Sequence, residues 1–93
     1  MKDTLQRHKD KIRRWLEPRF GLLDDLITDG VLSHEEVAEI TSKDTVFKQN
    51  DHLIKFLENK PADDYANFLL ALTNSMQQHV VNYLQNPGNN IFV

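Results

Sequence analysis

Apolar residues recur every three or four positions along almost the whole chain, and no segment alternates clearly between apolar and polar residues. The first pattern is typical of amphipathic helices, whereas the second would indicate a strand. Six helices are predicted: four over residues 3–16, 20–28, 34–41 and 46–59, a fifth that begins at Pro61, and a sixth that ends at Gln85. Because short turns join these helices, the sequence predicts an all-α protein, folded as a six-helix antiparallel bundle.

Some positions in this pattern carry more specific signals. Ser33 and Glu36 have the spacing of a capping box at the start of the third helix, and Gly30 suits the left-handed position after the second. Phe47 lies off the main apolar face of the fourth helix, and packing in the core or a turn is favoured for it over a contact role. The residues predicted to face the core include Leu5, Ile12, Trp15 and Leu16 in the first helix, and Tyr65, Phe68, Leu69, Leu72 and Met76 in the fifth.

Length and composition narrow the class of protein. The chain has 93 residues, of which 40% are hydrophobic, and this suits one domain with a modest core. We expect the domain to cover residues 1–86 and residues 87–93 to form a C-terminal tail or linker. Cysteine is absent, and no apolar run approaches the roughly 20 residues of a membrane-spanning helix. The expectation is a soluble cytoplasmic domain that makes no membrane contact.

Charge is sorted by position along the chain. Residues 1–19 carry seven Lys and Arg side chains against three acids, whereas residues 20–45 carry seven acids against one Lys. Like-charged pairs four residues apart, such as Asp25 with Asp29, weakly destabilise an isolated helix. A cation from another molecule would compensate them, and the sequence therefore favours two complementary charged faces.

The polar residues do not have the spacing of a catalytic, metal-binding or phosphate-binding site. The four histidines are scattered, and none has the paired spacing of metal ligands. The three glycines are too dispersed to form a phosphate-binding loop. Adjacent carboxylates, such as Asp24 and Asp25, point about 100° apart on a helix and do not converge on one substrate. We therefore predict no enzymatic activity, no metal and no cofactor.

Three segments, taken in order, resemble a known family. They are LLDDLITDGVLSHEEVAEI, NDHLIKFLENKPADDYANFLLAL and HVVNYL. Their order and spacing are similar to those of a caspase recruitment domain (CARD), a member of the death-domain superfamily, and the resemblance covers about residues 5–85. It implies the Greek-key arrangement of six helices found in that superfamily. One departure is Asn50–Asp51 in the fourth helix, where a basic residue is common in the family.

The resemblance also implies a function and a set of contact residues. A CARD mediates like-with-like protein interaction in apoptotic or inflammatory signalling and has no catalytic activity of its own. Its partner would be a CARD carried by a caspase, a kinase or an adaptor, or a second copy of the same chain, and repeated contacts would build a helical oligomer. The basic face would contain Arg7, Lys9, Lys11, Arg14 and Lys48, and the acidic face would contain Asp24, Asp25, Asp29, Glu35, Glu36 and Glu39.

Two other functions stay open from the residues alone. The basic first helix is compatible with a helical nucleic-acid-binding module. The net charge of −3 and the acidic second and third helices oppose binding to a polyanion, and we expect no nucleic-acid partner. A bundle of this size also serves as a structural part of a larger protein, and such a bundle would not self-associate.

Overall fold

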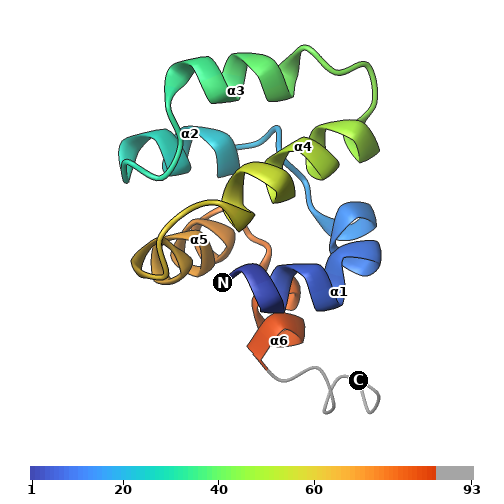
Figure 1. Cartoon of the computed structure of the whole chain (residues 1–93), viewed down its shortest axis with the longest axis vertical. Coiled ribbons are helices and arrows are strands. Elements are labelled where there is room, and N and C mark those ends of the chain that lie inside the picture. Colours follow the sequence, from blue (N-terminus) through green and yellow to red (C-terminus); the bar gives the residue numbers. More distant parts are fainter. Residues whose placement is uncertain (86–93) are drawn as a thin grey trace.

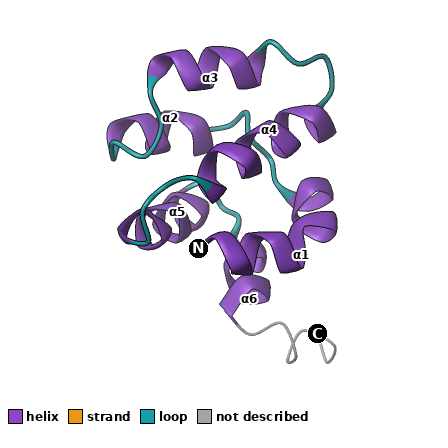
Figure 2. Ribbon diagram, viewed as in Figure 1, coloured by secondary structure: helices purple, strands orange, loops and turns teal. Residues whose placement is uncertain are grey.

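The computed structural model of the chain describes residues 1–85, and within that range it contains helices and turns but no strand (Figure 2). The helices confirm the predicted all-α class. The predicted end of the domain at residue 86 and the predicted tail lie outside the described residues. The helices are α1 (Lys2–Trp15), α2 (Leu22–Thr28), α3 (His34–Thr41), α4 (Val46–Glu58), α5 (Asp63–Asn74) and α6 (Gln78–Gln85).

The helices divide between the two ends of the molecule. Figure 1 shows α2 and α3 at one end of the long axis and α1 and α6 toward the other, with α4 crossing between them. α4 packs against both α1 and α3, and α5 packs against α2 and α6. Within residues 1–85, α1 contacts α4 and α6 but neither α2 nor α3. The fold therefore holds the basic first helix apart from the acidic second and third helices.

One apolar core joins all six helices. Its side chains come from the positions at which apolar residues repeat in the sequence, so burial follows the helical periodicity. α4 contributes Leu53, Ile54 and Leu57, all fully buried. The other large, fully buried side chains are Leu5 and Ile12 of α1, Leu22 and Leu26 of α2, Val31, Ile40 of α3, Phe68 and Leu72 of α5, and Val80 of α6.

Two helices begin later than the sequence pattern predicts. α2 starts after Gly21, whose φ of 108° is a left-handed conformation that a helix cannot continue. Phe20 consequently precedes the helix, and its side chain is 75% exposed. α5 begins at Asp63, with Ala62 as its N-cap, and not at Pro61. Pro61 lies in the preceding turn, where its carbonyl group accepts a hydrogen bond from the first turn of α5.

α2 and α5 end in the same backbone motif. Gly30 takes the left-handed position after α2, as predicted, with φ of 76°, and two hydrogen bonds close a Schellman motif. Met76 takes the same position after α5, with φ of 67°. The prediction that Met76 faces the core is wrong, because α5 ends at Asn74 and the Met76 side chain is 87% exposed. The tight turn into α6 places this side chain in solvent.

Trp15 is the other predicted core residue that lies elsewhere. Its side chain is 37% exposed and covers the seam between α1 and α6. Its ring centroid lies 5.3 Å from that of Tyr83 and 5.8 Å from that of His79, both in α6. Lys11 Nζ lies 4.4 Å from the Trp15 ring centroid, within the range of a cation–π contact. Trp15 therefore seals an edge of the bundle.

Two buried amide side chains hold the segment between α1 and α2. Asn50 of α4 donates from Nδ2 to the carbonyl oxygens of Arg13 and Leu16, each at 2.8 Å. Gln77 makes two hydrogen bonds with the backbone of Glu17: Oε1 accepts from its N–H and Nε2 donates to its carbonyl oxygen, each at 2.8 Å. These bonds satisfy backbone groups at and beyond the end of α1, where the helix offers them no partner. The Asn50 bonds also fix the end of α1 against α4, and the Gln77 bonds fix Glu17 against the turn before α6.

Candidate protein-interaction site

Three basic side chains surround one carboxylate where α1 packs against α4. Asp51 Oδ1 lies 3.2 Å from Arg13 Nη1 and 3.7 Å from Lys9 Nζ. Asp51 Oδ2 lies 3.0 Å from Lys55 Nζ. We call these four residues, Lys9, Arg13, Asp51 and Lys55, the α1–α4 cluster. It contains three cations and one anion. Asp10, an exposed acid of α1, also forms an ion pair with Arg13, and with Asp10 counted the cations still outnumber the anions by one.

The carboxyl group of Asp51 stays ionised in this setting. Partial burial of the side chain favours the neutral form and by itself would raise the pKa. Hydrogen bonds from Lys55 and Arg13, together with the charges of Lys55 and Lys9, outweigh burial, and the pKa of Asp51 lies below its ordinary value of 3.8. At neutral pH the cluster therefore holds a permanent anion among its cations.

Phe47 extends this surface along α4. Phe47, Asp51 and Lys55 follow one another at four-residue intervals, which places them on one stripe of the helix. The Phe47 ring is not in the core: the side chain is 45% exposed, and the guanidinium carbon of Arg13 lies 5.0 Å from its centroid. The sequence analysis favoured packing over contact for Phe47 and did not include Lys55. The structure places both on the side of α4 that meets α1.

The predicted basic residues of α1 point in two directions. Lys9 belongs to the α1–α4 cluster, together with Arg13, which the sequence analysis left out. Lys11 faces α6 instead. Arg7 and Arg14 are exposed, and their spacing places them near Lys11 on the helix surface. The four-residue spacing of Lys9 and Arg13 is visible in the sequence, but the sequence does not reveal which stripe of α1 meets α4.

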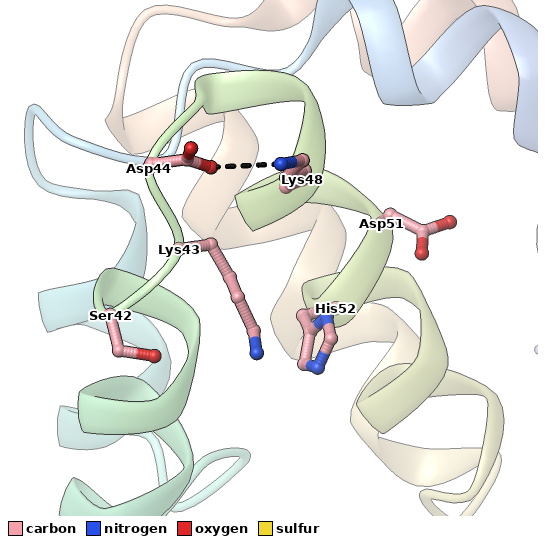
Figure 3. Close-up of a pocket in the computed structure, with 6 residues that line it drawn as sticks. All are labelled: Ser42, Lys43, Asp44, Lys48, Asp51 and His52. Carbon is pink, nitrogen blue, oxygen red and sulfur yellow. Dashed lines mark ion pairs between the residues drawn. The ribbon is translucent and has the colours of Figure 1, made fainter.

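Lys48, the residue expected from the fourth helix, lies beside a shallow hollow between the end of α3 and the start of α4. Its Nζ lies 3.1 Å from Asp44 Oδ1, which partly neutralises it. Figure 3 shows this pair, and it shows Asp51 directed away from Lys43 and His52. The hollow has a volume of about 390 Å³ and is lined by Ser42, Lys43, Asp44, Lys48, Asp51 and His52.

The acidic residues lie on the other side of the fold. Residues 22–41, which form α2, α3 and the turn between them, contain six acids and no Lys or Arg. Within the described part of the chain, four of these six carboxylates have no cation at ion-pair distance. They are Asp24 and Asp25 in the first turn of α2, Asp29 at its C-cap, and Glu35 in the first turn of α3.

The other two acids make contacts inside the domain. The predicted capping box is confirmed: Ser33 Oγ accepts from the Glu36 N–H at 3.1 Å, and Glu36 Oε1 accepts from the Ser33 N–H at 2.9 Å. Lys60 Nζ lies 2.9 Å from both carboxylate oxygens of Glu36. Burial would raise the pKa of Glu36, but Ser33 and Lys60 outweigh it and lower the pKa. Glu39 Oε1 lies 3.8 Å from His52 Nε2, an ion pair only when the histidine is protonated.

Within residues 1–85, no group of three His, Asp or Glu side chains is arranged to hold a metal ion. His8 Nδ1 lies 3.1 Å from the Tyr83 hydroxyl oxygen, and burial together with the Arg7 charge lowers the pKa of His8. None of the helices in this range has the length and apolar character needed to cross a bilayer.

The geometry defines a class of protein. It is a helical bundle that carries a cationic cluster and a set of unpaired anions on separate helices, as a protein-interaction domain does. The family described as "CARD: Caspase recruitment domain" matches residues 2–87, and the chain belongs to that family. This confirms the resemblance and the death-domain fold. CARDs bind other CARD-containing proteins in signalling and are interaction domains, not catalytic ones. No curated protein and no solved structure matches the chain.

Proposed function

We propose that this domain recruits another CARD by placing the basic face of one molecule on the acidic face of the next. The basic face is centred on the α1–α4 cluster, with Arg7, Lys11, Arg14 and Lys48 around it. The acidic face lies on α2 and α3 and contains Asp24, Asp25, Asp29, Glu35, Glu36 and Glu39.

The single observation that supports this function is the separation of the two charges by the fold. α1 makes no contact with α2 or α3 within residues 1–85, so its cations do not reach their anions. The carboxylates without an internal cation belong to α2, its C-cap and α3, while the α1–α4 cluster holds more cations than anions. A second domain supplies to each face the opposite charge that the first domain lacks.

The mode of assembly follows from the difference between the two faces. A contact between unlike faces is heterologous, and when it does not close into a ring it continues as a helix. One exposed ion pair contributes only about 0–1 kcal/mol, so a single pair of domains binds weakly. A domain that joins a growing helical oligomer makes several contacts at once. Assembly is therefore nucleated and responds sharply to concentration.

The chemistry of these faces supports two kinds of partner. A second copy of this chain has both of them, and the family resemblance implies the same basic and acidic arrangement for a CARD carried by a caspase, a kinase or an adaptor. The domain brings such a protein into an apoptotic or inflammatory complex in the cytoplasm. It contributes the contact and no catalysis.

Matched charge reversals test the contact. Asp24→Lys in the first turn of α2 should abolish self-association, measured by sedimentation velocity at about 0.05 M salt, where screening is weak. Asp63→Lys, at an exposed position in the first turn of α5, makes the same charge change at a residue assigned to neither face and should leave assembly intact. Lys9→Glu should abolish assembly from the basic side.

Mixing the two defective variants adds a second criterion. The Asp24→Lys variant keeps its basic face and the Lys9→Glu variant keeps its acidic face. Together they should form a pair but no longer oligomers, because the pair leaves no further competent face. If each single variant assembles like the parent domain, the faces are assigned wrongly.

A further inference from the structure

Asp51 is the one anion among the four residues of the α1–α4 cluster, and besides its pair with Lys55 within α4 it contacts cations of α1. It lies in the middle of the helix, away from the first turn, where the helix dipole favours a negative charge. Within the described residues its two carboxylate oxygens contact only Lys9, Arg13 and Lys55. Its side chain is 20% exposed, so it borders the surface that a partner would approach.

The same donors cannot serve Asp51 and a partner equally well. A carboxylate from the acidic face of another domain would form ion pairs with the cations that Asp51 already holds. It would also meet the negative charge of Asp51 at short range, in an interface where water is partly excluded and charge repulsion is stronger than in solution. Both effects oppose binding.

We propose that Asp51 is a built-in competitor that lowers the affinity of this basic face for the acidic face of another CARD. This inference rests on the function proposed above and adds its regulation. While the domain is alone, Asp51 occupies Lys9, Arg13 and Lys55. A single encounter is then weak, and only the several simultaneous contacts of an oligomer overcome the competition.

The sign of a mutational effect separates competition from positioning. If Asp51 served mainly to orient the cations for a partner, removing its charge would weaken binding. If Asp51 competes, the same change strengthens binding. Asp51→Asn keeps the shape of the side chain and one acceptor oxygen but removes the charge. The variant therefore isolates the effect of the Asp51 charge on binding.

The test uses a binary complex in which oligomers cannot form. The Asp24→Lys variant supplies the basic face, the Lys9→Glu variant supplies the acidic face, and calorimetric titration at about 0.05 M salt gives their Kd. Adding Asp51→Asn to the Asp24→Lys variant should tighten the Kd roughly five- to tenfold, because one screened like-charge repulsion is removed. Adding Asp63→Asn instead changes the net charge equally, at an exposed residue assigned to neither face, and should leave the Kd within about twofold.

The outcomes distinguish failure of the competitor role of Asp51 from failure of the proposed contact between the two faces. An unchanged or weaker Kd for Asp51→Asn, with a measurable Kd for the starting pair, overturns the competitor role and leaves the proposed function standing. No binding by the starting pair overturns both. Circular dichroism verifies folding, and Asp51→Ser, which removes the same charge with a smaller side chain, must shift the Kd in the same direction.

Discussion

The buried amide of Asn50 should determine both the stability of the domain and the position of its basic face. Its Nδ2 atom donates to the carbonyl oxygens of Arg13 and Leu16 at the end of α1, each at 2.8 Å, and its side chain is fully buried. Asn50→Ala removes both donors, so these two carbonyl groups lose their partner. The end of α1 then loosens from α4, and Arg13 loses the fixed backbone that aims it at Asp51.

The size of the effect follows from the hydrogen bonds. A buried group that loses its partner costs about 1–3 kcal/mol, so two carbonyl groups cost about 2–4 kcal/mol when the structure partly relaxes. Asn50 Oδ1 has no hydrogen-bond partner in the described residues, and deleting this atom returns about 1 kcal/mol. The net loss in the free energy of unfolding should be about 2 kcal/mol, a large share of the roughly 5–15 kcal/mol of a typical domain.

Urea denaturation followed by circular dichroism measures this loss. With an m-value of about 1.5 kcal/mol/M, the midpoint should fall by roughly 1.3 M. Asn59→Ala is the matched control, because the Asn59 Nδ2 atom makes one exposed bond, 3.2 Å long, to the carbonyl oxygen of Lys55 in its own helix. The control should lose at most about 0.5 kcal/mol. Equal losses for the two variants would refute the role given to the Asn50 amide.

Further outcomes test other parts of the structure. Raising the salt from about 0.1 M to about 1 M shortens the Debye length from roughly 10 to 3 Å, and should dissolve the oligomers seen by light scattering. Met76→Gly should stabilise the fold by about 0.5–1 kcal/mol in calorimetry, because glycine takes the left-handed position without a Cβ clash. Glu36→Gln should reduce the loss of stability that acidification causes. The pKa of Glu36 in the folded domain lies below its ordinary value of 4.5, so the ionised carboxylate stabilises the fold at pH values above 4.5. This stabilisation is lost as the pH falls through the folded-state pKa, and the Gln variant lacks it at every pH. A gel shift with duplex DNA at low salt should show no retarded band; a retarded band would favour the nucleic-acid alternative.

The parts of the fold that sequence could predict are those set by local chemistry. The periodicity of apolar residues predicted the six helices, and the capping box at Ser33 and Glu36 marked the start of α3, which has Ser33 as its N-cap. Gly30 marked the end of α2 because few other residues take its conformation at no cost. The same reasoning missed the end of α5, where Met76 adopts a positive φ that its side chain does not predict.

The candidate site depends on contacts between distant segments, and these were harder to predict. Lys9 and Arg13 meet Asp51 only because Asn50 and the core of α4 bring α1 against that helix. Sequence alone gave the charge of each helix but not the stripe that faces its neighbour. It therefore grouped Lys9 with Lys11, although the structure directs Lys11 to α6.

The arrangement of α1 opposite α2 and α3 along the long axis gives an isolated molecule a permanent electric dipole (Figure 1). Two such molecules turn toward a head-to-tail orientation before their surfaces touch, so a larger fraction of collisions begins in the productive orientation. Ionic strength should then act mainly on the association rate constant, while the lifetime of a formed pair depends on its short-range contacts.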